Sequence, residues 1–207
     1  MSAHAEALPH GGDHHHGPPA ANQSSRIPPT ILGMFMFIGT EAMLFGSFFA
    51  AYFFVRVVNP DAPDSWPPHP YEFPKFVAGI NTAILVTSSF TMHWALQSIK
   101  RNNRRGLLAG LILTILRGPA FLLTQFIEYA HIGFNTSDGA FASVFFGLTG
   151  LHGAHVFVGL TLLGMAAWRA YRGHFSPEHH HGVELPGIYW HFVDVMWIVV
   201  YVTVYLL

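Results

Sequence analysis

Long apolar segments recur five times along the chain and are separated by short stretches rich in proline, glycine or charge. Each is long enough to cross a bilayer as a helix, which needs about 20 mainly apolar residues. The pattern predicts an all-α integral membrane protein, a bundle of five transmembrane helices. The predicted spans are residues 30–58, 75–99, 106–131, 139–172 and 184–207.

The segments outside these spans have compositions that do not continue a helix. Residues 59–74, NPDAPDSWPPHPYEFP, are dense in proline and predict a surface loop, while residues 100–105, KRNNRR, predict a basic turn. Residues 1–29 are rich in His, Pro, Gly and Ala and do not resemble a secretory signal peptide. We interpret them as a disordered cytoplasmic tail, followed by one membrane domain over residues 30–207.

Basic residues near the predicted span ends are unevenly divided between the two sides of the membrane. Positive charge accumulates on the cytoplasmic side of membrane proteins, so the asymmetry predicts a cytoplasmic amino terminus and an external carboxyl terminus. One side has only Arg56 and Lys75, whereas the other has Arg26, Lys100, Arg101, Arg104, Arg105, Arg169 and Arg172.

Composition excludes a soluble enzyme as the default. Only 10% of the 207 residues are charged and 51% are hydrophobic, against about 25% charged in an ordinary globular domain. The chain has no cysteine, which excludes disulfides, thiolate metal sites and a cysteine nucleophile. A net charge of −1 indicates no particular partner.

The most unusual apolar stretch is GLHGAHVFVGL, residues 150–160. His152 and His155 are three residues apart and share one helix face. Gly150, Gly153 and Gly159 remove side chains from the same helix, so we expect neighbouring helices to approach it closely. We therefore place the centre of the protein here.

Glu41 lies in the middle of the first predicted span, beside Ala42, Gly46 and Ala50. Small residues four apart allow membrane helices to approach closely, so we expect this stripe to contact another helix. A carboxylate at this depth is costly unless it faces protein, a headgroup or water, or is protonated. Glu41 is therefore a functional candidate; the alternative is a neutral glutamic acid that only hydrogen-bonds a neighbouring helix.

The second predicted span is more polar than a helix surrounded by lipid would be, so one of its faces should be buried against other helices. Its polar residues include Asn81, Thr82, Thr87, Ser88, Ser89, Thr91 and His93.

The remaining spans also contain ionisable residues at membrane depth: Arg117 and Glu128 in the third, and His191 and Asp194 in the fifth. Counting from the cytoplasmic helix ends places Arg117 at the depth of Glu41, about 16 Å. Arg117 is thus a candidate to pair with Glu41, with a lipid phosphate or with an adjacent subunit. His191 and Asp194 share a face, which predicts an imidazole held by a carboxylate.

Three functions compete on these residues. A metal or haem site on His152, His155 and His191 is disfavoured, because an i,i+3 pair more often forms hydrogen bonds within a bundle. A transporter is disfavoured because the two halves show no convincing repeat. An accessory subunit of a larger complex, with polar residues that bind lipid and partner helices, is the third. We expect the triplets His14, His15, His16 and His179, His180, His181 to bind nothing specific.

Several segments together resemble cytochrome c oxidase subunit III, in order and with similar intervals over residues 33–207. The five-helix bacterial form is the closer resemblance, because the family's seven-helix members have two additional amino-terminal helices. The segments are TEAMLF (40–45), WPP (66–68), QFIEY (125–129), SVFFGLTGLHGAHVFVG (143–159) and YWHFVDVMW (189–197).

The resemblance implies a non-redox accessory subunit in the bacterial plasma membrane. It implies that subunits I and II of a proton-pumping haem–copper oxidase are partners, with cytochrome c as electron donor to the complex, and no nucleic acid. Haem and copper are expected in the partner subunits, and no catalytic or metal-binding residue in this chain. The expected role is support of proton uptake and of sustained turnover.

Residue by residue, Glu41 matches the family's carbodiimide-reactive intramembrane glutamate, and the family binds phospholipid in a cleft beside its first two helices. We therefore expect lipid-binding or proton-related roles for Glu41, Arg117, Glu128, His152 and His155. Arg117 and Pro119 depart from the family pattern, which is apolar at that point.

Two alternatives remain open on the sequence. One is a subunit III-like component of a nitric oxide reductase or another respiratory complex. The other is an independent metal-handling membrane protein, suggested by the 15 histidines.

Overall fold

The computed structural model describes residues 28–58, 75–176 and 180–207, and this part of the chain is helical, without strands. The histidines His14, His15, His16 and His179, the predicted tail up to residue 27 and the proline-rich loop lie outside the described residues. The elements are α1 (Pro29–Val58), α2 (Lys75–Lys100), α3 (Arg104–His131), α4 (Ala140–Arg172), α5 (His181–Tyr201) and a short π-helical segment, η2 (Val202–Leu206).

The five predicted spans correspond to these helices with small differences at their ends. The third begins two residues earlier than predicted, because Asn103 caps it by accepting a hydrogen bond from the backbone N–H of Gly106 at 3.0 Å. The fifth begins at His181 and changes to π-helix at Val202. Among the described helices, α1, α3, α4 and α5 with η2 are long and apolar enough to cross a membrane. At 26 residues α2 has the length, but its polar side chains make it less apolar.

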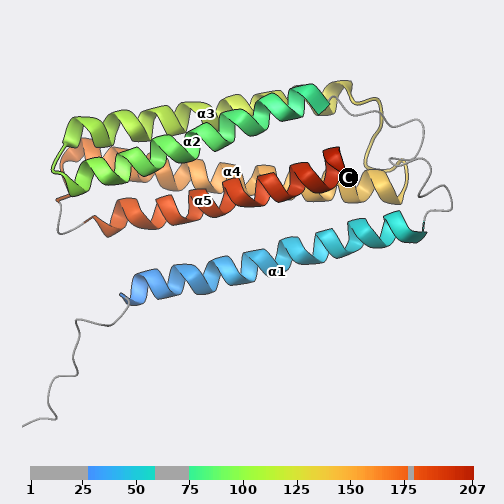
Figure 1. Cartoon of the computed structure of the whole chain (residues 1–207), viewed down its shortest axis with the longest axis horizontal. Helices are drawn as coiled ribbons and strands as arrows, with labels where there is room; N and C mark the ends of the chain where they lie inside the picture. The colour runs from blue at the N-terminus through green and yellow to red at the C-terminus, as the bar shows by residue number, and fades with distance from the viewer. Residues whose placement is uncertain (1–27, 59–74, 177–179) are drawn as a thin grey trace, which may run out of the picture.

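Helices α2 to α5 form a four-helix bundle, and α1 lies along one side of it against α4 and α5 (Figure 1). Neighbours in the bundle are α2 with α3, α3 with α4, α4 with α5, and α5 with α2. Large aromatic side chains fill its interior, including Phe121, Trp190 and Trp197 at 0% exposure. The polar face of α2 is turned inward, with Asn81 and Ser88 buried, as its sequence predicts.

Glycine allows close helix contacts at several points in the bundle. A Cβ atom on Gly110 would lie 2.9 Å from the backbone oxygen of Thr91, and one on Gly159 would lie 2.9 Å from Trp190 Cε3. The predicted close contact at Gly159 is therefore confirmed. At Gly150 it is wrong, because nothing lies within 4 Å of a Cβ atom built there.

The small-residue stripe of α1 also differs from its prediction. Ala42, Gly46 and Ala50 are exposed, and a Cβ atom on Gly46 would meet nothing within 4 Å. The helix instead contacts α4 and α5 through its other face, where Phe45 and Tyr52 are buried. Bulky aromatic side chains bury more apolar surface than a glycine stripe, which accounts for the rotation of α1 about its axis.

Candidate functional site: a polar pair between α1 and α4

The side chains of Glu41 on α1 and His155 on α4 meet where α1 packs against the four-helix bundle. His155 Nε2 lies 2.8 Å from Glu41 Oε2, and the side chains are 10% and 19% exposed, respectively. The other ring nitrogen of His155, Nδ1, lies 2.8 Å from the backbone oxygen of Leu151. Glu41 therefore faces protein, which is the condition that makes a carboxylate tolerable at this depth.

These two contacts fix one proton of the pair on Nδ1 and place a second between Nε2 and the carboxylate. A carbonyl oxygen only accepts, so Nδ1 of His155 carries a hydrogen and donates it to Leu151. The 2.8 Å contact between Nε2 and Glu41 Oε2 then holds one further proton. With that proton on oxygen the pair is neutral, and with it on nitrogen the pair is ionic. The geometry suits a proton shared between two helices.

Aromatic side chains surround the imidazole of His155. The ring centroid of Phe45 lies 4.9 Å from it, and that of Tyr189 lies 6.5 Å away with nearly parallel planes. Because both rings come from the helices that flank α4, they cover the pair and hold the imidazole in one orientation.

His152 occupies a different environment from His155, although the two share one side of α4. It is 0% exposed and packs between Trp197, at 4.8 Å, and the edge of Phe121, at 5.5 Å between ring centroids. Neither ring nitrogen has a hydrogen-bond partner among the described residues. His152 thus faces the bundle interior, whereas His155 faces α1.

Arg117 does not pair with Glu41 in the structure, so that candidate pairing is wrong for the described part of the chain. Its guanidinium donates to Thr91 Oγ1 at 3.3 Å and to the backbone oxygen of Leu113 at 3.1 Å. Arg117 lies on the side of α3 that faces α2, whereas α1 packs against α4 and α5. Equal depth in the membrane did not imply proximity.

His191 and Asp194 are linked through a third residue, which corrects the predicted direct pair. Ser89 Oγ lies 3.1 Å from His191 Nδ1, and the same hydroxyl donates to Asp194 Oδ2. Ser88 also lies within hydrogen-bonding distance of Asp194, at 3.4 Å, and accepts a hydrogen bond from Trp190 Nε1 at 2.9 Å. The two serines of α2 therefore hold the polar residues of α5 in place.

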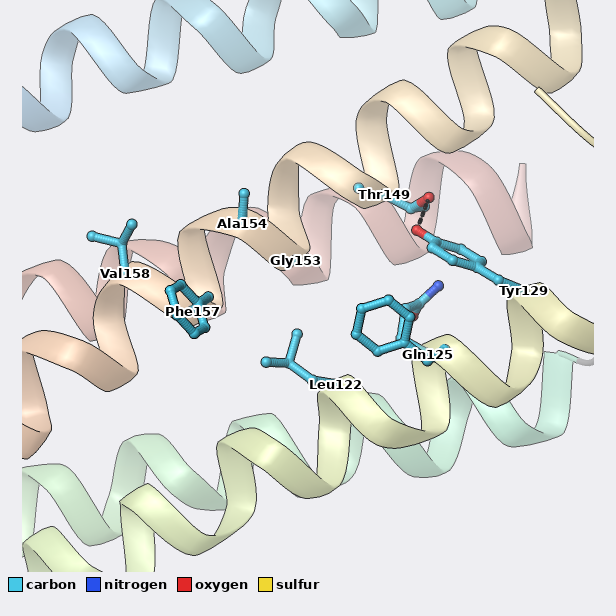
Figure 2. Close-up of a pocket in the computed structure, with 10 residues that line it drawn as sticks. Leu122, Gln125, Tyr129, Thr149, Gly153, Ala154, Phe157 and Val158 are labelled. Atoms are coloured by element: carbon cyan, nitrogen blue, oxygen red, sulfur yellow. Dashed lines mark hydrogen bonds between the residues drawn. The ribbon is translucent and has the colours of Figure 1, made fainter. Parts of the chain in front are cut away.

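Glu128 lies far from Glu41 in the chain and contacts other helices. Its Oε1 accepts a 2.7 Å hydrogen bond from the Tyr205 hydroxyl of η2, and the residue is 5% exposed. The next residue of α3, Tyr129, donates to Thr149 of α4 at 2.7 Å (Figure 2). Glu128 thus joins α3 to the carboxyl-terminal segment and does not belong to the pair on α1 and α4.

A groove near the amino-terminal end of α1 adds a feature that the sequence did not single out. It has a volume of about 300 Å³ and is lined by Met34, Leu162, Met165 and Arg169, among others. Arg169 is the cation of this lining and contacts the ring of Phe175 at 5.3 Å. In the sequence Arg169 contributes only to the positive-inside asymmetry, and its place at a groove follows from the helix arrangement.

The described residues contain no cluster that fits a metal ion. They contain no group of three or more His, Cys, Asp or Glu side chains placed to hold one ion. Both ring nitrogens of His155 are engaged, while His152 is enclosed by aromatic rings. No step of the function is therefore assigned to a metal on these residues.

Comparison with known proteins gives the family. The profile described as Cytochrome c oxidase subunit III matches residues 26–207. Cytochrome c oxidase subunit 3 of Thermostichus vulcanus is 39% identical over 178 residues, 86% of this chain and 87% of that protein. The subunit 3 proteins of Loxodonta africana and Dugong dugon are 38% and 40% identical, covering 92% and 84% of this chain and 72% and 67% of their own lengths. With its helical architecture and apolar helices, this chain belongs to the cytochrome c oxidase subunit III family.

Proposed function

We propose that this chain is the non-redox accessory subunit of a proton-pumping haem–copper cytochrome c oxidase in a bacterial plasma membrane. In this role it binds subunit I, with subunit II in the same complex, and cytochrome c supplies the electrons. Membership of the subunit III family supports the assignment to such a complex. The chemistry of oxygen reduction belongs to haem and copper in the partner subunits.

The observation that carries the proposed role is the Glu41 and His155 pair. His155 Nε2 and Glu41 Oε2 are 2.8 Å apart, so a proton between them can move from oxygen to nitrogen without a change in side-chain position. It also holds α1, the helix with the fewest buried residues, to the bundle. The pair therefore supports both parts of the proposal, proton-related chemistry and the cohesion that sustained turnover requires.

Phospholipid is the second proposed partner. The groove with Arg169 has apolar walls and one guanidinium, a combination that suits an acyl chain and a phosphate. Arg169 lies in the last turn of α4, near the level at which headgroups are expected. We propose that lipid bound there fills the space between α1 and the bundle.

The proposal is tested by comparing the purified oxidase with and without this chain. The chain should co-purify with a haem-containing partner in a complex that oxidises cytochrome c. Removal of the chain should leave the first turnovers near normal and shorten the lifetime of activity during continuous turnover. Loss of the first turnovers with an intact haem spectrum would contradict an accessory role. Co-purification with a nitric oxide-reducing partner would support the alternative complex instead.

A further inference from the structure

An arginine lies at the middle of a membrane helix on the side of the bundle formed by α2 and α3. Arg117 has 13 residues of α3 before it and 14 after it. Its side chain is only partly buried. Helix α1 packs against α4 and α5, so the α2 and α3 side lies away from the Glu41 and His155 pair (Figure 1).

The positive charge of Arg117 is not neutralised within the described part of the chain. Its Nη1 donates to two neutral oxygens, Thr91 Oγ1 at 3.3 Å and the backbone oxygen of Leu113 at 3.1 Å. It forms no salt bridge with a described residue. An arginine keeps its charge in proteins, and a charge at this depth is costly unless it is paired.

The unused nitrogens of Arg117 have the geometry of an anion site. Nε and Nη2 have no hydrogen-bond partner among the described residues. Both retain accessible surface, because neither is one of the enclosed, unpaired polar atoms of this part of the chain. Together they form a planar edge of the guanidinium that can bind both oxygens of a carboxylate or phosphate.

The depth of Arg117 argues against a lipid phosphate at this edge. The hydrocarbon core is about 30 Å thick, so the middle of a centred helix is about 15 Å from either boundary. The bond from Nη1 to Leu113 keeps the guanidinium within one helical turn, about 5.4 Å, of the level of Arg117. The charge therefore lies about 10 Å inside the hydrocarbon, away from the headgroups.

A second copy of this chain has no free carboxylate in its membrane helices to offer. The acidic residues of these helices are Glu41, Glu128, Glu184 and Asp194. Glu41 is bonded to α4, Glu128 and Asp194 are buried within the bundle, and Glu184 lies in the first turn of α5, far from the membrane centre. The charge that complements Arg117 must therefore belong to another polypeptide.

We propose that the face of α2 and α3 around Arg117 docks a transmembrane helix of another subunit, which presents an aspartate or glutamate at the membrane centre. The carboxylate binds Nε and Nη2 of Arg117. Trp94, one turn from Thr91 on α2, and Leu116, next to Arg117 on α3, are 46% and 64% exposed and pack against the same helix. The inference rests on the proposed assembly into an oxidase complex and assigns one docking face within it.

The test places a photoreactive amino acid, benzoylphenylalanine, at Leu116 in the whole oxidase complex. After irradiation, crosslinked peptides are identified by mass spectrometry. The expected product joins this chain to a transmembrane peptide of another subunit that contains Asp or Glu. Met43 is the matched control position, because it is 78% exposed near the middle of α1, on another side of the bundle. It should not give this peptide.

Substitutions of Arg117 test the role of its charge. Arg117→Leu should lower the yield of the product about tenfold or more, because it leaves the partner's carboxylate unpaired. Arg117→Lys keeps the charge without the bidentate edge and should lower the yield less. Arg117→Glu combined with Arg in place of the partner's carboxylate should restore it. Arg101→Leu removes an exposed arginine from the turn before α3 and should leave the yield unchanged.

Failure of this inference differs from failure of the proposed function. A chain that does not co-purify with haem-containing subunits would contradict its assignment to an oxidase complex. If it co-purifies and Leu116 gives only lipid adducts, a second copy of this chain or a peptide without Asp or Glu, the docking proposal is wrong. An unchanged yield in the assembled Arg117→Leu complex would also overturn it. If Arg117→Leu does not assemble, the paired charge reversal decides the question.

Discussion

His155 Nε2 lies 2.8 Å from Glu41 Oε2, while Nδ1 of the same ring donates to the backbone oxygen of Leu151. The second contact leaves Nε2 of a neutral imidazole as an acceptor. A group at position 41 that can donate a hydrogen bond therefore preserves the link between α1 and α4, and one that cannot donate breaks it. This distinction separates the effects of two substitutions at the same position.

Glu41→Ala should give a near-normal initial rate of oxygen reduction followed by faster loss of activity during turnover. The substitution leaves His155 Nε2 without a partner, at a cost of about 1–3 kcal/mol, which loosens α1 and bound lipid without unfolding the bundle. Glu41→Gln should be mild, because its amide N–H donates to Nε2. Activity is followed over many turnovers at saturating cytochrome c. Loss of the first turnovers in an assembled Glu41→Ala complex would contradict the prediction.

A double-mutant cycle should separate the partner of Glu41 from a residue at the same depth. Removing Glu41 and His155 singly and together should give a coupling energy of about 0.5–3 kcal/mol, as expected for residues in contact. Glu41 and Arg117 should be additive to within about 0.5 kcal/mol, because Arg117 bonds Thr91 and Leu113. Denaturant stability of this chain is the measured quantity. A coupling energy between Glu41 and Arg117 as large as that between Glu41 and His155 would contradict the arrangement in which Arg117 faces α2.

Ser89→Ala should destabilise the contact between α2 and α5 by about 1–3 kcal/mol, because it removes a hydroxyl that bonds both His191 and Asp194. Ser47→Ala is the control. Among the described residues, the exposed Ser47 hydroxyl donates only to the Leu44 carbonyl of its own helix. Thermal unfolding of the purified complex gives the comparison. Equal effects of the two substitutions would show that the link through Ser89 contributes nothing.

Gly159→Ala should destabilise the bundle, although alanine is a better helix former than glycine. The new Cβ atom would lie 2.9 Å from Trp190 Cε3, and that ring is buried and bonded to Ser88, so overpacking costs about 1–3 kcal/mol. Gly164→Ala has nothing within 4 Å of its Cβ atom and should be neutral or stabilising by up to about 1 kcal/mol. The midpoint of thermal unfolding should fall for Gly159→Ala and should stay unchanged or rise for Gly164→Ala.

The histidine triplets should be dispensable for oxidase activity. Deleting residues 1–23 and replacing His179, His180 and His181 by Ser should leave the initial rate unchanged. In the described part of this region, His181 lies 3.1 Å from Glu184 on the surface, a pair worth at most about 1 kcal/mol. A large fall in the initial rate would show that one of the segments supplies protons or contacts a partner.

The sequence alone determined the elements and the family of this protein. Apolar length and proline or charge between the segments specify helices locally, so all five predicted spans correspond to helices, with small differences at their ends. The motifs TGLHGAHV and YWHFVDVMW led to the family that the comparisons then showed. The side chain of Asn103 caps α3 and explains why this helix begins earlier than predicted.

Which polar residues meet was decided by the tertiary structure. Periodicity places a residue on a helix face, but the rotation of each helix and its choice of neighbours depend on side chains distant in sequence. Phe45 and Tyr52 turned α1 so that Glu41 meets His155 and its small-residue stripe faces outward. The same nonlocal packing placed Ser89 between His191 and Asp194.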